Sequence, residues 1–90
     1  MSAPAEPSGL TFPTDFPIKI MGRREPGFAQ AMADLVGRHA SDFDPATMTM
    51  RPSSGGKYLS LTVTIRAVSR EQLDALYREL SAHPMVSMAL

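Results

Sequence analysis

The stretch that decides the fold is MRPSSGGKYLSLTVTIRA, residues 50–67. From Leu59 to Ala67 every second residue is apolar, and β-branched residues are frequent. Strict alternation of this kind predicts a strand over residues 57–67 with one buried face and one polar face. The segment 52–56 before it is typical of a hairpin loop. The sequence therefore predicts a sheet that is covered on one side only.

Length and composition restrict the class of protein. A chain of 90 residues forms one domain with a small core. It contains no Cys, which excludes disulfides, thiol chemistry and Cys-ligated metals and suits a reducing compartment. No apolar run is long enough to span a membrane, and residues 1–9 lack the features of a signal peptide. We therefore expect a cytoplasmic protein with no membrane association.

The N-terminal half predicts a tail, a strand and a helix. Residues 1–11 are rich in Pro, Ala, Ser and Gly, which predicts a disordered tail before a single domain over residues 12–90. Alternation predicts a first strand over residues 16–21. The following apolar stripe has helical spacing and predicts a helix over residues 26–39, with Pro26 in its first turn.

The C-terminal half completes the set of elements. Residues 46–51 read as a second strand, before the hairpin. Ser69 with Gln72 predicts a capping box and Val68 with Leu73 a hydrophobic staple, so a second helix begins there and ends at His83-Pro84. Residues 85–90 predict a last strand. Its expected inward side chains are Val86, Met88 and Leu90.

The order of elements selects one architecture. Strand, helix, strand, strand, helix, strand gives two helices, which cover only one face of a four-stranded sheet. The handedness of the crossovers then leads to an α+β, ferredoxin-like βαββαβ sandwich with an antiparallel sheet. In it the first and third strands are central and the second and fourth are edges. The strand with the best alternation thus falls at the centre.

Several short motifs, in their order and spacing, resemble the YbeD-like proteins of bacteria. They are Phe12-Pro13-Thr14-x-Phe16, Lys19-x-Met21-Gly22, Pro52-Ser53-Ser54-x-Gly56-x-Tyr58, Ser60 and the strand after it, and Met88-x-Leu90. The resemblance covers residues 12–90. It implies a ferredoxin-like fold close to ACT-type regulatory domains, in a family without an assigned biochemical role or catalytic residues. Genes of the family often lie near lipoate-biosynthesis genes.

Six of the nine basic residues fall on the polar strand faces, in the first loop or in the hairpin, although the net charge is zero. Lys19, Arg51 and Arg66 fall on polar strand faces, whereas no acid falls within a predicted strand. We therefore predict an electropositive open face that binds a protein partner, a second copy of the chain or a small anionic ligand. The alternative is that these charges only provide solubility and edge protection. The candidate surface comprises Lys19, Met21, Gly22, Arg23, Arg24, Arg51, Lys57, Tyr58, Thr62, Thr64 and Arg66.

Other chemistries find little support in the residues. RNA binding needs aromatic platforms on the central strands, and the polar face offers only Tyr58. Acylphosphatase chemistry, on a related topology, needs an Asn that orients water, and the chain has no Asn. Neither His39 nor His83 has a partner at metal-ligand spacing, so we expect no metal site. No cofactor motif or catalytic constellation is present.

Two functions follow as expectations. The first is a non-enzymatic regulatory or adaptor module that binds a protein partner, or itself, through its open basic face and its edges. The second is an ACT-like sensor of an amino acid or another carboxylic acid. This expectation depends on Gly22. In ACT domains a turn that contains Gly follows the first strand and lets a ligand approach the backbone. The alternative reading is that Gly22 only supplies a positive φ in a tight turn.

Overall fold

The computed structural model describes residues 11–90 and confirms the predicted α+β, ferredoxin-like fold. Of the predicted tail, all but Thr11 lies outside the described residues. The elements, in chain order, are β1 (Thr14–Arg23), α1 (Phe28–His39), the short 3₁₀ helix η2 (Pro45–Thr47), β2 (Thr49–Pro52), β3 (Tyr58–Ala67), α2 (Arg70–Ala82) and β4 (Val86–Ala89).

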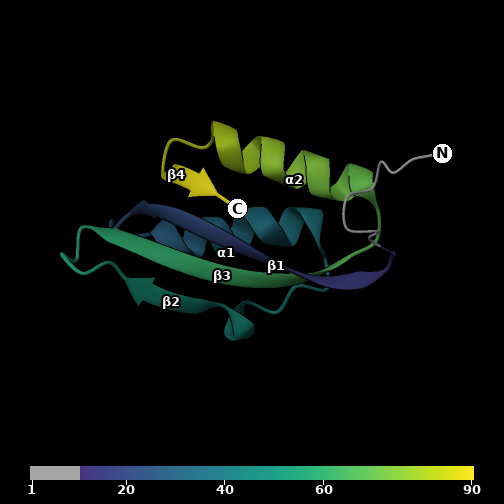
Figure 1. Ribbon diagram of the computed structural model, residues 1–90, viewed down its shortest axis with the longest axis horizontal. Coiled ribbons are helices and arrows are strands. Elements are labelled where there is room, and N and C mark those ends of the chain that lie inside the picture. Colours follow the sequence, from purple (N-terminus) through teal and green to yellow (C-terminus); the bar gives the residue numbers. More distant parts are fainter. Residues whose placement is uncertain (1–10) are drawn as a thin grey trace.

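The sheet is built around the pairing of β1 with β3. These strands are antiparallel and pair over their whole length, from Thr14 with Ala67 to Arg23 with Tyr58. The strand order is β2-β3-β1-β4, so the predicted central and edge strands are confirmed. Figure 1 shows β1 and β3 running side by side along the long axis of the molecule.

Both helices pack on one face of this sheet, which we call the covered face. Apolar side chains of α1 and α2 form a single buried cluster with alternate residues of β1 and β3. The fully buried large side chains are Phe28, Ile18, Ile20, Met32, Leu35, Leu61, Ile65, Leu76, Leu80, Val36 and Val63. Burial of side chains of this size, at about 1.5–3 kcal/mol each, is the main favourable contribution to folding.

Helix α1 begins later than its sequence predicts, because Pro26 belongs to a turn. Gly27 has φ 85° and ψ −6°, and the Phe28 N–H donates to the Glu25 carbonyl over 3.2 Å. Pro followed by a Gly of positive φ defines a type II turn. The prediction that Pro26 lies in the first helical turn is therefore wrong, and Phe28 is the first helical residue.

Helix α2 begins as predicted at its cap, although without the hydrophobic staple. The Gln72 N–H donates to Ser69 Oγ over 3.1 Å, and Gln72 Oε1 accepts from the Val68 N–H over 2.7 Å. The first bond satisfies a donor that the helix itself leaves unpaired, and the second fixes the residue before the cap. Val68 is 59% exposed, so it contributes too little burial to form the predicted staple with Leu73.

The predicted inward side of β4 is wrong for two of its three residues. The register between β1 and β4 shifts between Met21 and Gly22, so that Gly22 pairs with Val86 but Met21 pairs with Met88. A bulge of this kind reverses the alternation of side chains that follow it. Met88 (49% exposed) and Leu90 (65% exposed) therefore lie on the uncovered side, and Ala89 replaces them on the covered side.

Two other strands differ in extent. β2 starts only at Thr49, because Asp44 caps the turn before it by accepting from the Ala46 N–H over 3.0 Å. β1 is longer than predicted at both ends and includes Asp15 and Gly22. An acid therefore does lie within a strand, contrary to the prediction.

Gly22 is required by close packing and not by its backbone angle. It lies inside β1 and does not have a positive φ, unlike Gly27 and Gly56. A Cβ at this position would lie 2.7 Å from the Phe28 ring and 2.3 Å from the Met85 carbonyl oxygen. Both readings of Gly22 as a turn residue are therefore wrong.

Substituting Gly22 by Ala tests this packing. We expect Gly22→Ala to destabilise the fold by about 1–3 kcal/mol, because a backbone carbonyl cannot give way as a flexible side chain does. Gly37→Ala is the matched control, because a Cβ added at Gly37 would have no heavy atom within 4 Å. Ala at this position of α1 should stabilise the fold by up to about 1 kcal/mol. Urea unfolding measures both, and equal effects would contradict the account.

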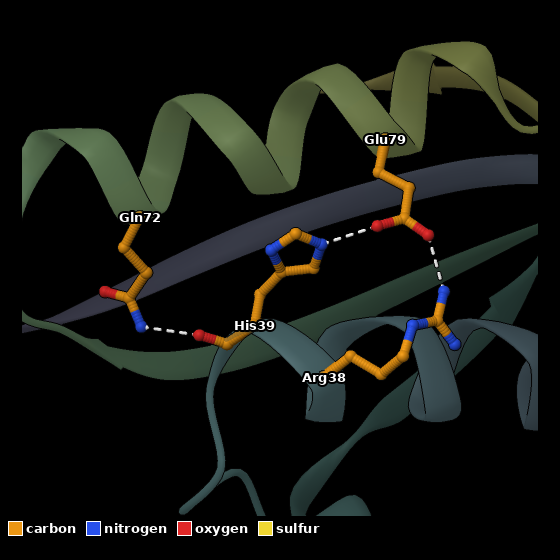
Figure 2. A network of polar contacts seen from close by, with 4 residues as sticks. All are labelled: Arg38, His39, Gln72 and Glu79. Carbon is orange, nitrogen blue, oxygen red and sulfur yellow. Dashed lines mark hydrogen bonds and ion pairs between the residues drawn. The ribbon is translucent and has the colours of Figure 1, made fainter.

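A polar network joins the end of α1 to α2 (Figure 2). Glu79 Oε2 accepts from Arg38 Nη2 over 2.5 Å, and Glu79 Oε1 lies 2.6 Å from His39 Nε2. Gln72 Nε2 donates to the His39 carbonyl over 2.9 Å. The hydrogen bonds from His39 and Arg38 lower the pKa of Glu79. This network accounts for His39 as a structural residue.

Thermal unfolding against pH tests the contribution of Glu79. Since its pKa is lowered in the folded state, its stabilising effect is complete above the ordinary value of about 4.5 and is lost as the pH falls through the lower folded value. We expect Glu79→Gln to lower Tm at neutral pH and to lose this difference in acid. Asp74→Asn, also on α2, is the control. A Tm difference that is independent of pH would contradict the assignment.

Candidate functional site

The side of the sheet away from the helices, which we call the open face, carries the polar residues of the central strands. Strand register orders them into rows. In the first row Thr49, Thr62 and Lys19 are neighbours across three strands, and Lys19 exchanges two backbone hydrogen bonds with Leu90, of 3.1 and 2.9 Å.

The second row lies beside the first on the same face, two residues away along each strand. It runs from Arg51 on β2 through Ser60 on β3 and Met21 on β1 to Met88 on β4. Both rows are therefore polar over β2 and β3, whereas their β4 ends are apolar.

The polar parts of the two rows surround a shallow hollow of about 260 Å³. Its lining residues are Lys19, Thr49, Met50, Arg51, Ser60 and Thr62. An ammonium, a guanidinium and three hydroxyl groups all supply hydrogen-bond donors. The hollow is therefore suited to an anionic group.

The cations of the open face differ in their partners. Arg66 Nη1 lies 3.4 Å from Asp15 Oδ1 across the strand pair, so its charge is partly neutralised. Arg23 lies over the Tyr58 ring at 6.0 Å from its centroid, within the range of a cation–π contact. Within residues 11–90, Lys19 has no ion-pair partner, and neither has Arg51. The hollow therefore holds two cations whose charge no carboxylate of the described residues balances.

The remaining residues of the predicted surface separate into three places. Arg24 and Lys57 lie at the hairpin end, where the Arg24 N–H donates to the Lys57 carbonyl over 2.8 Å. Thr64 is exposed near the opposite end, beside the Asp15–Arg66 pair. Gly22 faces the helices and is covered by Phe28, so its inclusion in the candidate surface is wrong.

Sequence reasoning left four residues out of the candidate surface that the structure places in the two rows. Thr49 and Ser60 alternate in sequence with residues of the covered face. This alternation was the signal that could have included them in the candidate surface. Met88 and Leu90 had no such signal, because their orientation depends on the bulge opposite Met21.

No group of three or more potential acidic, His or Cys ligands comes together in residues 11–90. His83 Nδ1 accepts from the Met85 N–H over 3.1 Å, which places this His at the turn into β4. Among the described helices, none has the length and apolar character needed to cross a membrane.

Comparison with known proteins gives relatives in sequence and neighbours in structure. A family model described as "Protein of unknown function (DUF493)" matches residues 7–90. A UPF0250 protein of Bordetella pertussis is 56% identical over 97% of this chain and 96% of its own. A UPF0250 protein of Nitrosomonas europaea is 53% identical over 94% of this chain and 98% of its own. These matches confirm the resemblance seen in the sequence.

The structural neighbours support the fold. The solution structure of protein HP0495 from H. pylori matches with a TM-score of 0.76 and 12% identity, over 100% of this chain and 94% of that chain. The ACT domain from the GTP pyrophosphokinase of Chlorobium tepidum matches with a TM-score of 0.63 and 17% identity, over 84% of each chain. At these identities the likeness shows an ACT-like fold.

The stability of charge-neutral variants tests whether Lys19 and Arg51 have a structural role. We expect Lys19→Gln and Arg51→Gln each to change the free energy of unfolding by less than about 0.5 kcal/mol, because both side chains are exposed and have no ion-pair partner in the described structure. Ile18→Ala, one residue away on the covered face, should cost about 2–5 kcal/mol. A large loss in either Gln variant would contradict a free binding surface.

Proposed function

This chain belongs to the DUF493 family of proteins of unknown function, and we propose that it acts as a non-enzymatic regulatory or adaptor module. Its open face binds an acidic surface of a protein partner. The observation that carries the proposal is the hollow between Lys19 and Arg51, two cations with no ion-pair partner in the described structure. Complementary charge on a partner would supply the missing counter-charge and favour encounter.

The open face is a better binding surface than the β2 edge or the end of β1 that β4 leaves unpaired. The Ser53 N–H donates to the Tyr58 carbonyl over 2.9 Å. Because bonding groups alternate along a strand, the backbone nitrogen of Pro52 faces the free edge of β2. The backbone N–H and C=O of Lys19 bond to Leu90, on the β4 side of β1. The backbone of Pro17, two residues earlier, faces the same side, at a point that the β4 pairing does not reach. Pro has no N–H to donate to an added strand, so Pro52 blunts the β2 edge and Pro17 blunts the part of β1 that β4 leaves unpaired.

The ACT-like sensor is the second candidate. The fold likeness to an ACT domain agrees with a regulatory role, and a small carboxylic acid would suit the donors of the hollow. It ranks second because the Phe28 ring and the Met85 carbonyl already fill the space at Gly22 that this reading required. The absence of any thermal shift with amino acids and lipoate-related acids would remove it.

Affinity capture with a charge-reversed face tests the proposal. We expect the wild-type protein to retain an identified acidic protein that cross-links to open-face residues and is released by salt. Arg51→Glu should reduce capture at least about tenfold, since it replaces attraction by repulsion of similar size. Adding Lys19→Glu should abolish capture.

Arg78→Glu is the matched control, because it makes the same change of residue and charge on the exposed side of α2. It should leave capture unchanged. Equal losses for Arg51→Glu and Arg78→Glu, or cross-links confined to the helices, would contradict binding at the open face.

A further inference from the structure

The open face is divided into a polar half and an apolar half. The hollow lies mainly over β2 and β3, with Arg51 and three hydroxyl groups from these strands, and Lys19 of β1 lines its inner side. Over β1 and β4 lie Met21, Met88 and Leu90, of which Met88 and Leu90 are substantially exposed. Lys19 lies between the two halves, next to Leu90 on one side and Thr62 on the other. A ligand that uses the whole face must therefore be acidic on one side and apolar on the other.

The width of the face indicates the form of that ligand. Neighbouring strands lie about 4.8 Å apart, so the centres of the two halves are separated by two such spacings, or about 10 Å. An added extended segment covers about one strand spacing and would reach only one half. An α-helix with its side chains is about 10–12 Å across, which matches the separation. A helix lying along β1 and β3 would contact both halves at once.

The chemistry of each half supports the same ligand. Carboxylates on one stripe of the helix would reach the Lys19 ammonium and the Arg51 guanidinium, where charge-assisted hydrogen bonds are strong. Asp15, the acid on this face, is held by Arg66 at the far end of β1, so it opposes such a ligand little. Methionine side chains adapt to apolar partners of varied shape. Met21 and Met88 therefore form a suitable surface for the apolar stripe.

We propose that the open face binds an amphipathic α-helix of a partner protein, with its acidic stripe over the hollow and its adjoining apolar stripe over Met21, Met88 and Leu90. The proposal rests on the proposed function and specifies the form of the partner. It commits the face to an acidic helix and not to a second copy of this chain.

Synthetic helical peptides test the proposal by fluorescence anisotropy. The first carries Leu on one stripe and Glu on the adjoining stripe. The second replaces each Glu by Gln, and the third places the same Glu residues opposite the Leu stripe. We expect the first to bind in a salt-dependent manner and at least about tenfold more tightly than the other two, because only it fits both halves. Equal binding of all three would overturn the proposal.

Variants of the protein separate the two halves. Arg51→Gln should weaken binding of the first peptide about tenfold or more, as should the double variant Met88→Ser with Leu90→Ser, whose side chains are 49% and 65% exposed. Circular dichroism and urea unfolding confirm that each variant is folded. Arg78→Gln on α2 should have no effect. Loss of binding in this control, or none in the face variants, would overturn the proposal.

The outcome also distinguishes this inference from the proposed function. If no peptide binds but a captured protein cross-links to the open face, the helical form is wrong and the binding face stands. If the captured protein cross-links to the helices, both are wrong. Sedimentation gives the remaining case: a wild-type dimer that Met88→Ser with Leu90→Ser converts to monomer would show that a second copy occupies the face, and would overturn the proposal.

Discussion

The pairing of β1 with β3 over ten consecutive residue pairs is the constraint on which the rest of the structure depends. Since side chains alternate along each strand, this register places Ile18, Ile20 and Val63 on one face and Lys19 and Thr62 on the other. If one of these strands slipped by one residue, all its apolar side chains would turn to the opposite face of the sheet. The helices cover the apolar face, and the cationic hollow results on the opposite one.

Close packing on the covered face also shapes the open face. Phe28 and the Met85 carbonyl approach Gly22 so closely that a side chain there would not fit. At the same place the register of β4 shifts, and the shift turns Met88 outward. The apolar half of the open face therefore depends on a bulge next to a glycine, while the polar half depends on the regular alternation of β2 and β3. Folding and the candidate function share these determinants.

The sequence predicted the features that arise from local patterns and missed those that arise from contacts between distant residues. Alternation in β3 and the cap at Ser69 are local, and both predictions were confirmed. The network of Glu79 with Arg38 and His39 joins residues about 40 positions apart, so no periodicity reveals it. For the site, the alternation located the cations correctly, but the orientation of Met88 depends on a bulge that no single strand encodes.

We propose that the open face is the working surface of the molecule. The most direct test of this proposal is a map of backbone amide chemical shifts in isotope-labelled protein, recorded before and after addition of the captured partner. We expect the largest shifts on β1, β2 and β3 around the hollow and on β4 at Met88, with α2 unchanged at Arg78. Shifts confined to the exposed sides of α1 and α2 would contradict it.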